Sequence, residues 1–505
     1  MLRTFVAFLA LALSACAPHI VVLRGGTLVD GTGAAARTGD VALQGDRILA
    51  VGAYDGPADR TIDCAGLVVA PGFIDLHTHS DSQLAKPKLR QNLSYLTQGV
   101  TTVVTGNCGY GPVDAAAYFN EIWGRVGTNV IHLVPHGSVR AAVMGNANRE
   151  PTADELDRMR ALVDRAMKDG AWGMSTGLIY EPGTYAKTEE IVELSKAVAR
   201  HGGFYATHMR NEGDDLLKSI DETLRIGKEA GLPVHVSHLK SAGRRNWGRM
   251  KEACERLRQA RAEGHAVTAD QYPYTASSTQ LGAMLVPVEA RSDARKLDDP
   301  AVRERIRKSV EERDGGAMVR IASCRKRKEW EGKSIKQIAE EEKRDAVDIV
   351  IEIQRNGGAS AVSFGMSEED VRIAMGYAFV ATASDGSSKL PGDDVPHPRS
   401  YGTYPRKIGR YAIEEKVVTL EMAVWSSSGL PAQVLKLADR GALKAGAHAD
   451  VVVFDPKTFR DVATFDEPHQ FSTGVVWLFV NGHAAIENGA PREVLAGRVL
   501  RHASR

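Results

Sequence analysis

Apolar residues near the two ends of the chain occur in short runs that are typical of β-strands. The runs are residues 21–23, 41–43 and 48–51 near the start, and 451–454, 475–480 and 483–486 near the end. Turn residues separate them, among them Asn481-Gly482, the pair that a type I′ hairpin turn prefers. Because both ends have this pattern, we predict one small β-sandwich domain formed by residues 19–70 together with residues 440–500.

Residues 71–439 alternate short apolar runs with helical periodicity, which is typical of a parallel α/β sheet. The candidate strands are residues 68–76, 101–105, 129–135, 171–175, 204–207, 234–237, 266–270 and 378–384. Thr152 and Glu155 form a capping box, and Gly170 stands where the helix that follows should end. Eight strands with intervening helices predict a (β/α)8 TIM-like barrel. The highly charged residues 291–354, between the last two strands, predict an inserted subdomain or lid.

The first sixteen residues predict an export signal. Arg3 precedes an unbroken apolar stretch over residues 5–13, which is too short to span a bilayer, and small residues lead into Cys16. This segment resembles a bacterial lipoprotein signal, with cleavage before Cys16 and lipidation of its thiol. The resemblance implies a lipid-anchored protein of the bacterial envelope, on the outer membrane and facing the periplasm, whose membrane contact is the lipid alone. An ordinary secretory peptide is the other interpretation, and it also predicts export.

Composition narrows the class of partner. The 505 residues are 43% hydrophobic and 25% charged, as in globular proteins, and the net charge is +1. Without a substantial basic tract the chain lacks the charge pattern of a nucleic-acid-binding protein, so we expect a small-molecule substrate. Five cysteines are too few for a disulfide scaffold. Composition carries no information on the oligomeric state.

Residues with side chains that bind metals follow five of the predicted strands. They are His77 and His79, Cys108, His208, His238 and Asp385. In a parallel barrel the carboxyl ends of the strands meet at one rim, so these side chains are expected to lie together there. Each of these residues alone is more often structural, but their shared placement is hard to assign to chance.

Thiolate and imidazole together favour zinc, which accepts both ligand types in tetrahedral geometry. One four-coordinate ion that keeps a water cannot use all of these ligands. The residues therefore predict a two-site arrangement in which Cys108 is able to bridge.

Three motifs resemble those of the amidohydrolase superfamily, specifically the N-acyl-D-amino-acid deacylases (D-aminoacylases). They are Pro71-Gly-Phe-Ile-Asp-Leu-His-Thr-His-Ser-Asp81, Gly99-Val-Thr-Thr-Val-Val-Thr-Gly-Asn-Cys-Gly109 and His208-Met-Arg-Asn-Glu212. The resemblance covers residues 19–500. Most binuclear members bridge their metals with a carboxylated lysine after the fourth strand, whereas residues 173–177 offer no lysine and Cys108 takes that place. The resemblance implies zinc-dependent hydrolysis of N-acyl-D-amino acids to a carboxylate and a free D-amino acid.

The same resemblance implies roles for individual residues. It implies one zinc held tightly by Cys108, His208 and His238, and a weaker or empty second site at His77, His79 and Cys108. Asp385 resembles the general base that also returns the proton. The residues that resemble substrate-binding ones are Arg399, Lys240, one tyrosine of Tyr180 and Tyr185, and one of Tyr272 and Tyr274.

Two other functions stay open at this point. One is a related amidohydrolase that acts on dipeptides with a D-residue or on cyclic amides. The other is an inactive lipoprotein of the envelope that binds a ligand. The preferred side chain, the acyl group and the preference for D over L substrates cannot be derived from the residues.

Overall fold

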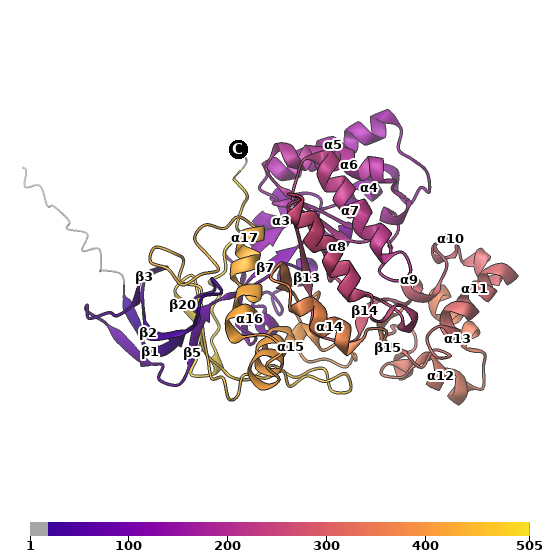
Figure 1. The fold of residues 1–505 in the computed structure, drawn as a ribbon. Coiled ribbons are helices and arrows are strands. Elements are labelled where there is room, and N and C mark those ends of the chain that lie inside the picture. Colours follow the sequence, from indigo (N-terminus) through magenta and orange to yellow (C-terminus); the bar gives the residue numbers. More distant parts are fainter. Residues whose placement is uncertain (1–18, 504–505) are drawn as a thin grey trace, which may run out of the picture.

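The computed structural model describes residues 19–503, so Cys16 and the predicted export signal lie outside the described residues. A barrel of parallel strands and helices occupies the centre of the molecule (Figure 1). A sheet formed by the two chain ends lies on one side of the barrel, and an inserted unit of residues 277–363 lies on the other.

Eight parallel strands form the barrel. They are β6 (Phe73–Asp75), β7 (Val100–Thr105), β8 (Asn129–His132) with its continuation β9 (Val134–Pro135), β10 (Gly173–Gly177), β11 (Phe204–His208), β12 (Val234–Val236), β13 (Val267–Gln271) and β17 (Val380–Thr382). Successive strands pair in parallel, and a parallel bridge between Thr78 and Gly386 brings the last strand beside the first. The (β/α)8 barrel predicted from the sequence is confirmed.

Helices cover the barrel strands (Figure 1). The principal ones are α3 (Ala115–Ile122), α4 (His136–Met144), α5 (Ala153–Lys168), α6 (Thr188–Arg200), α7 (Leu216–Ala230), α8 (Met250–Ala262), α14 (Glu368–Met375), α15 (Arg399–Pro405), α16 (Leu420–Ser427) and α17 (Gly429–Val434). Helix α5 buries Met159, Val163 and Met167 on one face. Both hydrogen bonds of its Thr152–Glu155 capping box are present, and such caps typically contribute about 1 kcal/mol to stability.

The two chain ends form one mixed sheet of nine strands. These are β1 (Ile20–Leu28), β2 (Arg37–Gln44), β3 (Arg47–Gly52), β4 (Arg60–Asp63), β5 (Val68–Pro71), β18 (Val451–Phe454), β19 (Val475–Val480), β20 (His483–Glu487) and β21 (Ala490–Pro491). β5 pairs with β1 on one side and antiparallel with β18 on the other, which joins the two ends of the chain. Apolar side chains of both ends share one core, including Leu23, Val41 and Phe479. This sheet fits the predicted β-sandwich domain.

The apolar run over residues 68–76, expected to be one strand, is divided at Gly72 into β5 and β6. The first half belongs to the terminal sheet and the second half to the barrel. At the break the Gly72 N–H donates to the Asp450 carbonyl, 2.8 Å away. A Cβ at position 72 would lie 2.3 Å from Thr101 Cγ2, so a side chain has no room there. Gly72 therefore lets one extended segment serve two sheets.

The inserted unit has a three-stranded antiparallel sheet and a core of its own. Its elements are β14 (Ser277–Gln280), α9 (Leu281–Leu285), α10 (Val288–Arg291), α11 (Pro300–Glu311), β15 (Val319–Ser323), α12 (Ile335–Glu342), α13 (Ala346–Arg355) and β16 (Ser360–Ser363). The expected segment, residues 291–354, lies within it. The unit is larger than expected because β14 pairs with β16. The sequence analysis did not include β14, because this strand is polar and has no apolar pattern.

We expect Gly72→Ala to lower the free energy of unfolding by about 1–3 kcal/mol, because the added methyl group must displace the buried Thr101 side chain. The measurement is the change in the midpoint of thermal unfolding. Gly392→Ala is the matched control, since a Cβ there meets no atom closer than 3.6 Å. Equal midpoints for the two variants would contradict this account of the division between β5 and β6.

Candidate metal centre and active site

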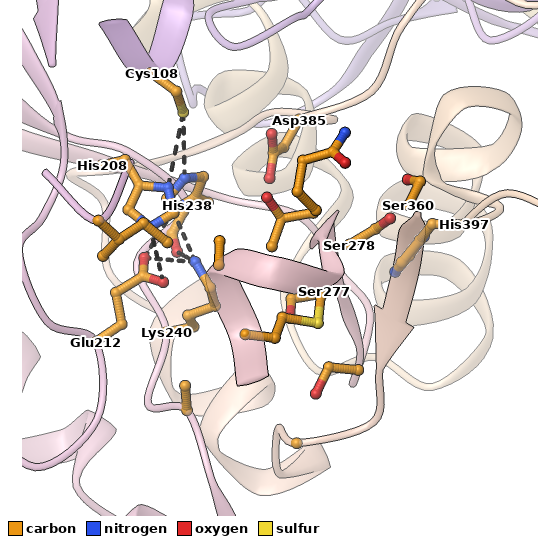
Figure 2. A pocket seen from close by; sticks show the side chains of 18 of the residues that line it. Cys108, His208, Glu212, His238, Lys240, Ser277, Ser278, Ser360, Asp385 and His397 are labelled. Carbon is orange, nitrogen blue, oxygen red and sulfur yellow. Dashed lines mark hydrogen bonds and ion pairs between the residues drawn. The ribbon is translucent and has the colours of Figure 1, made fainter. Parts of the chain in front are cut away.

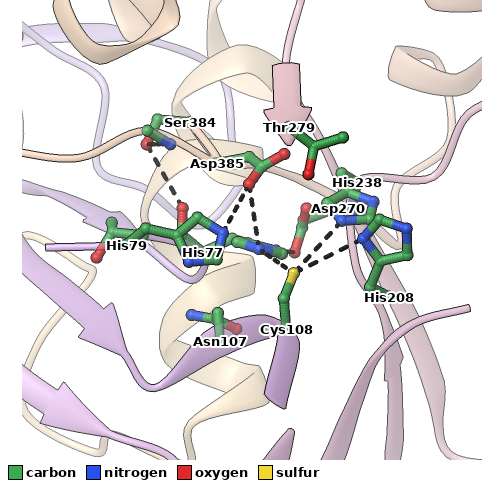
Figure 3. Close-up of polar contacts among 12 residues, drawn as sticks. His77, His79, Asn107, Cys108, His208, His238, Asp270, Thr279, Ser384 and Asp385 are labelled. Carbon is green, nitrogen blue, oxygen red and sulfur yellow. Dashed lines mark hydrogen bonds and ion pairs between the residues drawn. The ribbon is translucent and has the colours of Figure 1, made fainter. Parts of the chain in front are cut away.

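The carboxyl ends of the barrel strands bring the predicted metal ligands together (Figure 3). Cys108 Sγ lies 3.8 Å from His208 Nδ1 and 3.7 Å from His238 Nε2. Ligands of one tetrahedral zinc, with Zn–S near 2.3 Å and Zn–N near 2.0–2.1 Å, are about 3.6 Å apart. The spacing of this thiolate and these two rings therefore fits one ion.

A second group of ligands adjoins the first. His77 Nε2 lies 3.3 Å from Cys108 Sγ and 3.4 Å from Asp385 Oδ1, and His79 Nε2 lies 3.0 Å from the same carboxylate oxygen. His77 and Cys108 thus stand between the two groups. This is the arrangement that two neighbouring metal sites sharing the thiolate require.

Three of these residues have backbone conformations that non-glycine residues rarely adopt. The φ angles of Cys108, His238 and Asp385 are +52°, +36° and +51°. Left-handed conformations at non-glycine residues are uncommon and typically cost on the order of 1–3 kcal/mol, so the surrounding structure must hold them. At each of these three residues the backbone leaves the direction of the preceding strand, at the rim of the barrel.

The electrostatics favour anionic ligands beside the rings. Burial alone would raise the pKa of the Cys108 thiol, but His77, His208 and His238 outweigh it and hold that pKa well below its usual value. Burial also opposes ionisation of Asp385, and the neighbouring Arg399 and His77 hold the pKa of this carboxyl well below its usual range. A thiolate and a carboxylate therefore face the same buried point, which suits a divalent cation.

Two carboxylates that the sequence analysis did not assign to the site orient the rings. Asp270 Oδ1 accepts a hydrogen bond from the His238 backbone N–H at 2.6 Å, and its Oδ2 lies 3.5 Å from His77 Nδ1. Glu212 lies 2.9 Å from His238 Nδ1 and 3.5 Å from His208 Nε2. Such partners fix the tautomer and the orientation of metal-binding imidazoles. The available signals were that Asp270 ends a predicted strand and that Glu212 ends the His208 motif.

Lys240, expected to contact substrate, lies in this network. Its Nζ donates to Glu212 Oε1 at 2.5 Å and to the His238 carbonyl at 3.1 Å. It also lines the cavity described next. The structure therefore places Lys240 beside the His238 ring as well as at the cavity.

A cavity of about 1080 Å³ opens beside the ligands (Figure 2). Tyr180 and Tyr272 line it, together with Arg399 and Asp385. The Tyr180 hydroxyl lies 2.8 Å from Thr279 Oγ1, and the Tyr272 ring packs under the Arg399 guanidinium at 4.9 Å. These two tyrosines are placed to contact a bound molecule.

The other tyrosine of each pair does not line the cavity. The Tyr185 hydroxyl donates to Glu181 Oε1 at 2.9 Å, and Tyr185 ends the short helical turn of residues 183–185. Tyr274 is buried with its ring against His397 and Arg406. The structure thus separates residues that the sequence left equivalent, because the chain direction after each strand decides which tyrosine faces the rim.

Arg399 lies beside Asp385 at the wall of the cavity. Its Nη1 donates to Asp385 Oδ2 at 2.7 Å, and its Nη2 donates to the Ser278 carbonyl at 3.1 Å. Ser278 belongs to β14, so the inserted unit takes part in holding this arginine. A buried guanidinium that faces a cavity is suited to bind a carboxylate.

Known proteins are similar to this chain in both sequence and fold. A model of the amidohydrolase family matches residues 60–486. The chain belongs to the amidohydrolase family. It is 38% identical to the D-aminoacylase of Alcaligenes xylosoxydans xylosoxydans, over 96% of this chain and 98% of that protein. The resemblance to N-acyl-D-amino-acid deacylases predicted from the motifs is confirmed.

Solved structures of relatives have the same fold as this amidohydrolase over nearly the whole chain. A D-aminoacylase structure with a binuclear metal centre is 38% identical, with a TM-score of 0.84 over 95% of this chain and 99% of that one. N-acyl-D-glutamate deacylase from Bordetella bronchiseptica, complexed with zinc and a phosphonate inhibitor, is 34% identical, with a TM-score of 0.83 over 96% and 100%.

We expect Cys108→Ala to lose its bound metal, because the thiolate is the one ligand that both groups share. Metal content of the purified protein is the measurement. Cys254→Ala, which removes a buried cysteine from α8, should keep its metal and serves as the control. A Cys108→Ala protein with the metal content of the wild type would show that the thiolate is not a ligand.

Proposed function

We propose that this protein is a zinc-dependent deacylase that hydrolyses N-acyl-D-amino acids to a carboxylate and a free D-amino acid. The observation that carries the proposal is one rim where the Cys108 thiolate meets the His208 and His238 rings, with Asp385 and Arg399 beside them. A metal, a proton acceptor and a cation for a carboxylate are what this reaction needs. The relatives named above are deacylases of this kind, which supports the same reaction for this chain.

The donor set fits zinc, which when bound lowers the pKa of a water molecule toward about 7 and polarises a carbonyl group. Asp385 is anionic and sits within 3.4 Å of both His77 and His79. From there its carboxylate takes a proton from the attacking water and returns it to the departing amine nitrogen. A second, weaker metal site formed by His77, His79 and Cys108 is part of the proposal.

The substrate's α-carboxylate is proposed to bind at Arg399, whose planar guanidinium pairs with carboxylates through two parallel hydrogen bonds. Tyr272 lies against that guanidinium, and Lys240 lies near the same ring at 5.9 Å. Tyr180 packs against His208, and its hydroxyl is proposed to donate to the scissile carbonyl. These contacts fix the amide over the metal centre.

The alternatives fit the site less well. A cyclic amide has no free carboxylate for Arg399 to bind, and likeness to D-hydantoinase at 14% identity concerns the fold alone. An inactive binding protein would not need Asp385 beside a complete ligand set. A dipeptide with a C-terminal D-residue does have the carboxylate, so substrate assays must decide that case.

The proposed activity is tested with zinc-loaded protein and chirally pure pairs of N-acetyl amino acids, N-acetyl-D-amino acid carboxamides and D-residue dipeptides. We expect amine release from the N-acetyl-D-amino acids in preference to the L forms. Removing the carboxylate charge should lower kcat/KM about 10- to 100-fold, since hydrogen bonds to charged groups contribute about 1.5–3 kcal/mol. Zinc-loaded protein that releases no amine from any N-acyl amino acid would rule out this substrate class.

Asp385→Asn should lose turnover by about 10²- to 10⁴-fold, because the amide cannot accept the proton. Its zinc content should stay near that of the wild type, since Cys108, His208 and His238 remain. Steady-state rates and metal analysis on one preparation separate the two effects. Asp394→Asn, a carboxylate at the same cavity paired with Lys389, should keep its activity. Full activity in Asp385→Asn would mean that another group is the base.

We also propose that the protein is exported and lipid-anchored in the bacterial envelope through Cys16. The apolar stretch over residues 5–13 and the small residues before Cys16 support this. No helix within residues 19–503 combines the length and the apolar character that crossing a membrane demands.

Cys16→Ser should abolish incorporation of labelled fatty acid into the protein in bacterial cells, because the thioether-linked lipid needs the thiol. Ser14→Ala keeps that thiol and should remain labelled. Labelling is followed by gel electrophoresis after metabolic feeding. Unlabelled wild-type protein released into the medium would favour the ordinary secretory signal instead.

A further inference from the structure

The turn that presents Cys108 has unusual backbone conformations at three of its four positions, residues 106–109. Gly106, Cys108 and Gly109 all have positive φ, at +77°, +52° and +75°. The turn follows β7 and is buried. A non-glycine residue does not hold this conformation unaided, so contacts from outside the turn must fix the direction of the thiolate.

Ser175 of β10, the fourth barrel strand, bonds the turn on both sides of Cys108. Its Oγ accepts a hydrogen bond from the Gly109 N–H at 3.0 Å and donates one to the Gly106 carbonyl. Ser175 is 1% exposed, so water does not compete for these partners. One hydroxyl therefore satisfies two buried backbone groups that flank the thiolate.

Other hydrogen bonds also hold this turn, and the Tyr110 N–H closes it by donating to the Asn107 carbonyl at 3.2 Å. Asp81 Oδ1 accepts from the Gly106 N–H at 2.6 Å, and Asn107 Nδ2 donates to the carbonyls of Leu76 and Val104. Among the hydrogen bonds given by the described residues, the Ser175 side chain alone bonds both Gly106 and Gly109.

The turn also packs directly on the backbone of β10. A Cβ at Gly177 would lie 2.2 Å from the Cys108 carbonyl oxygen. The end of this strand is thus shaped to receive the turn: a small polar residue at position 175 and no side chain at position 177.

We infer that Ser175 is a positioning residue for the metal-binding thiolate of Cys108. Its hydroxyl fixes the left-handed turn, and through it the distance of Sγ from the His208 and His238 rings. Groups that orient a metal ligand typically change metal affinity about 10- to 100-fold when they are removed. The inference rests on the metal site proposed above.

The test is zinc affinity, measured by competition with a chromogenic chelator, for Ser175→Ala in the full mature chain. We expect zinc binding about 10- to 100-fold weaker than in the wild type. Cobalt-substituted Ser175→Ala should also show a weaker and shifted thiolate-to-cobalt absorption band, because the sulfur is less well directed. Ser175→Thr keeps the hydroxyl and should bind zinc more tightly than Ser175→Ala.

Ser195→Ala is the matched control. Ser195 is a buried serine of α6 whose Oγ has no hydrogen-bond partner, so its loss should leave zinc affinity unchanged. A folded Ser175→Ala with wild-type zinc affinity and an unchanged cobalt band would overturn the inference. Cys108→Ala in the same titration separates the two proposals: if it still binds zinc, the metal site itself is wrong.

A measurement on the wild type keeps the inference testable if Ser175→Ala does not fold. Hydrogen–deuterium exchange of the metal-free protein reports on the Gly109 amide. Its hydrogen bond to Ser175 should make this amide exchange slowly, although no metal holds the turn. Rapid exchange at Gly109 in the folded metal-free protein would show that the serine does not fix the turn.

Discussion

The buried thiolate of Cys108 is the group on which the rest of the site depends. An anion with 4% exposure needs positive or hydrogen-bonding partners on every side, and the barrel supplies them as the rings of His77, His208 and His238. Asp270 lies 3.5 Å from His77 Nδ1 and Glu212 lies 2.9 Å from His238 Nδ1, and these carboxylates orient the two rings. Without the sulfur, the rings and carboxylates would surround a position that no longer carries the thiolate charge.

The turn that carries Cys108 also accounts for the small residues at the end of β10. A bridging lysine would extend from the end of β10, whereas the proposed bridging thiolate of Cys108 is carried by the turn after β7, which packs against β10. Ser175 and Gly177 leave the space that this turn fills. A cysteine on this turn therefore needs small residues at the end of β10.

Much of the fold and most of the site could be predicted from the sequence, because both follow short-range rules. Apolar runs mark barrel strands, and a ligand that follows such a run lies at the rim. What could not be predicted depends on contacts between distant segments. Gly72 divides one apolar run between two sheets, β14 is a strand without apolar alternation, and only the path of the chain separates Tyr180 from Tyr185. Asp270 and Glu212 were missed because a carboxylate near a strand end is common.

Because of the position of β14, the barrel supplies the metal-binding side chains, whereas the inserted unit helps to hold the residues proposed to bind substrate. Every ring and the thiolate at the metal centre come from the barrel, whereas Arg399 and Tyr180 are each held by a residue of β14, through the Ser278 carbonyl and the Thr279 hydroxyl. The inserted unit has its own core, so it is able to diverge without disturbing the barrel. Relatives that share the metal ligands can therefore differ in the molecules they select by exchanging or reshaping one peripheral module.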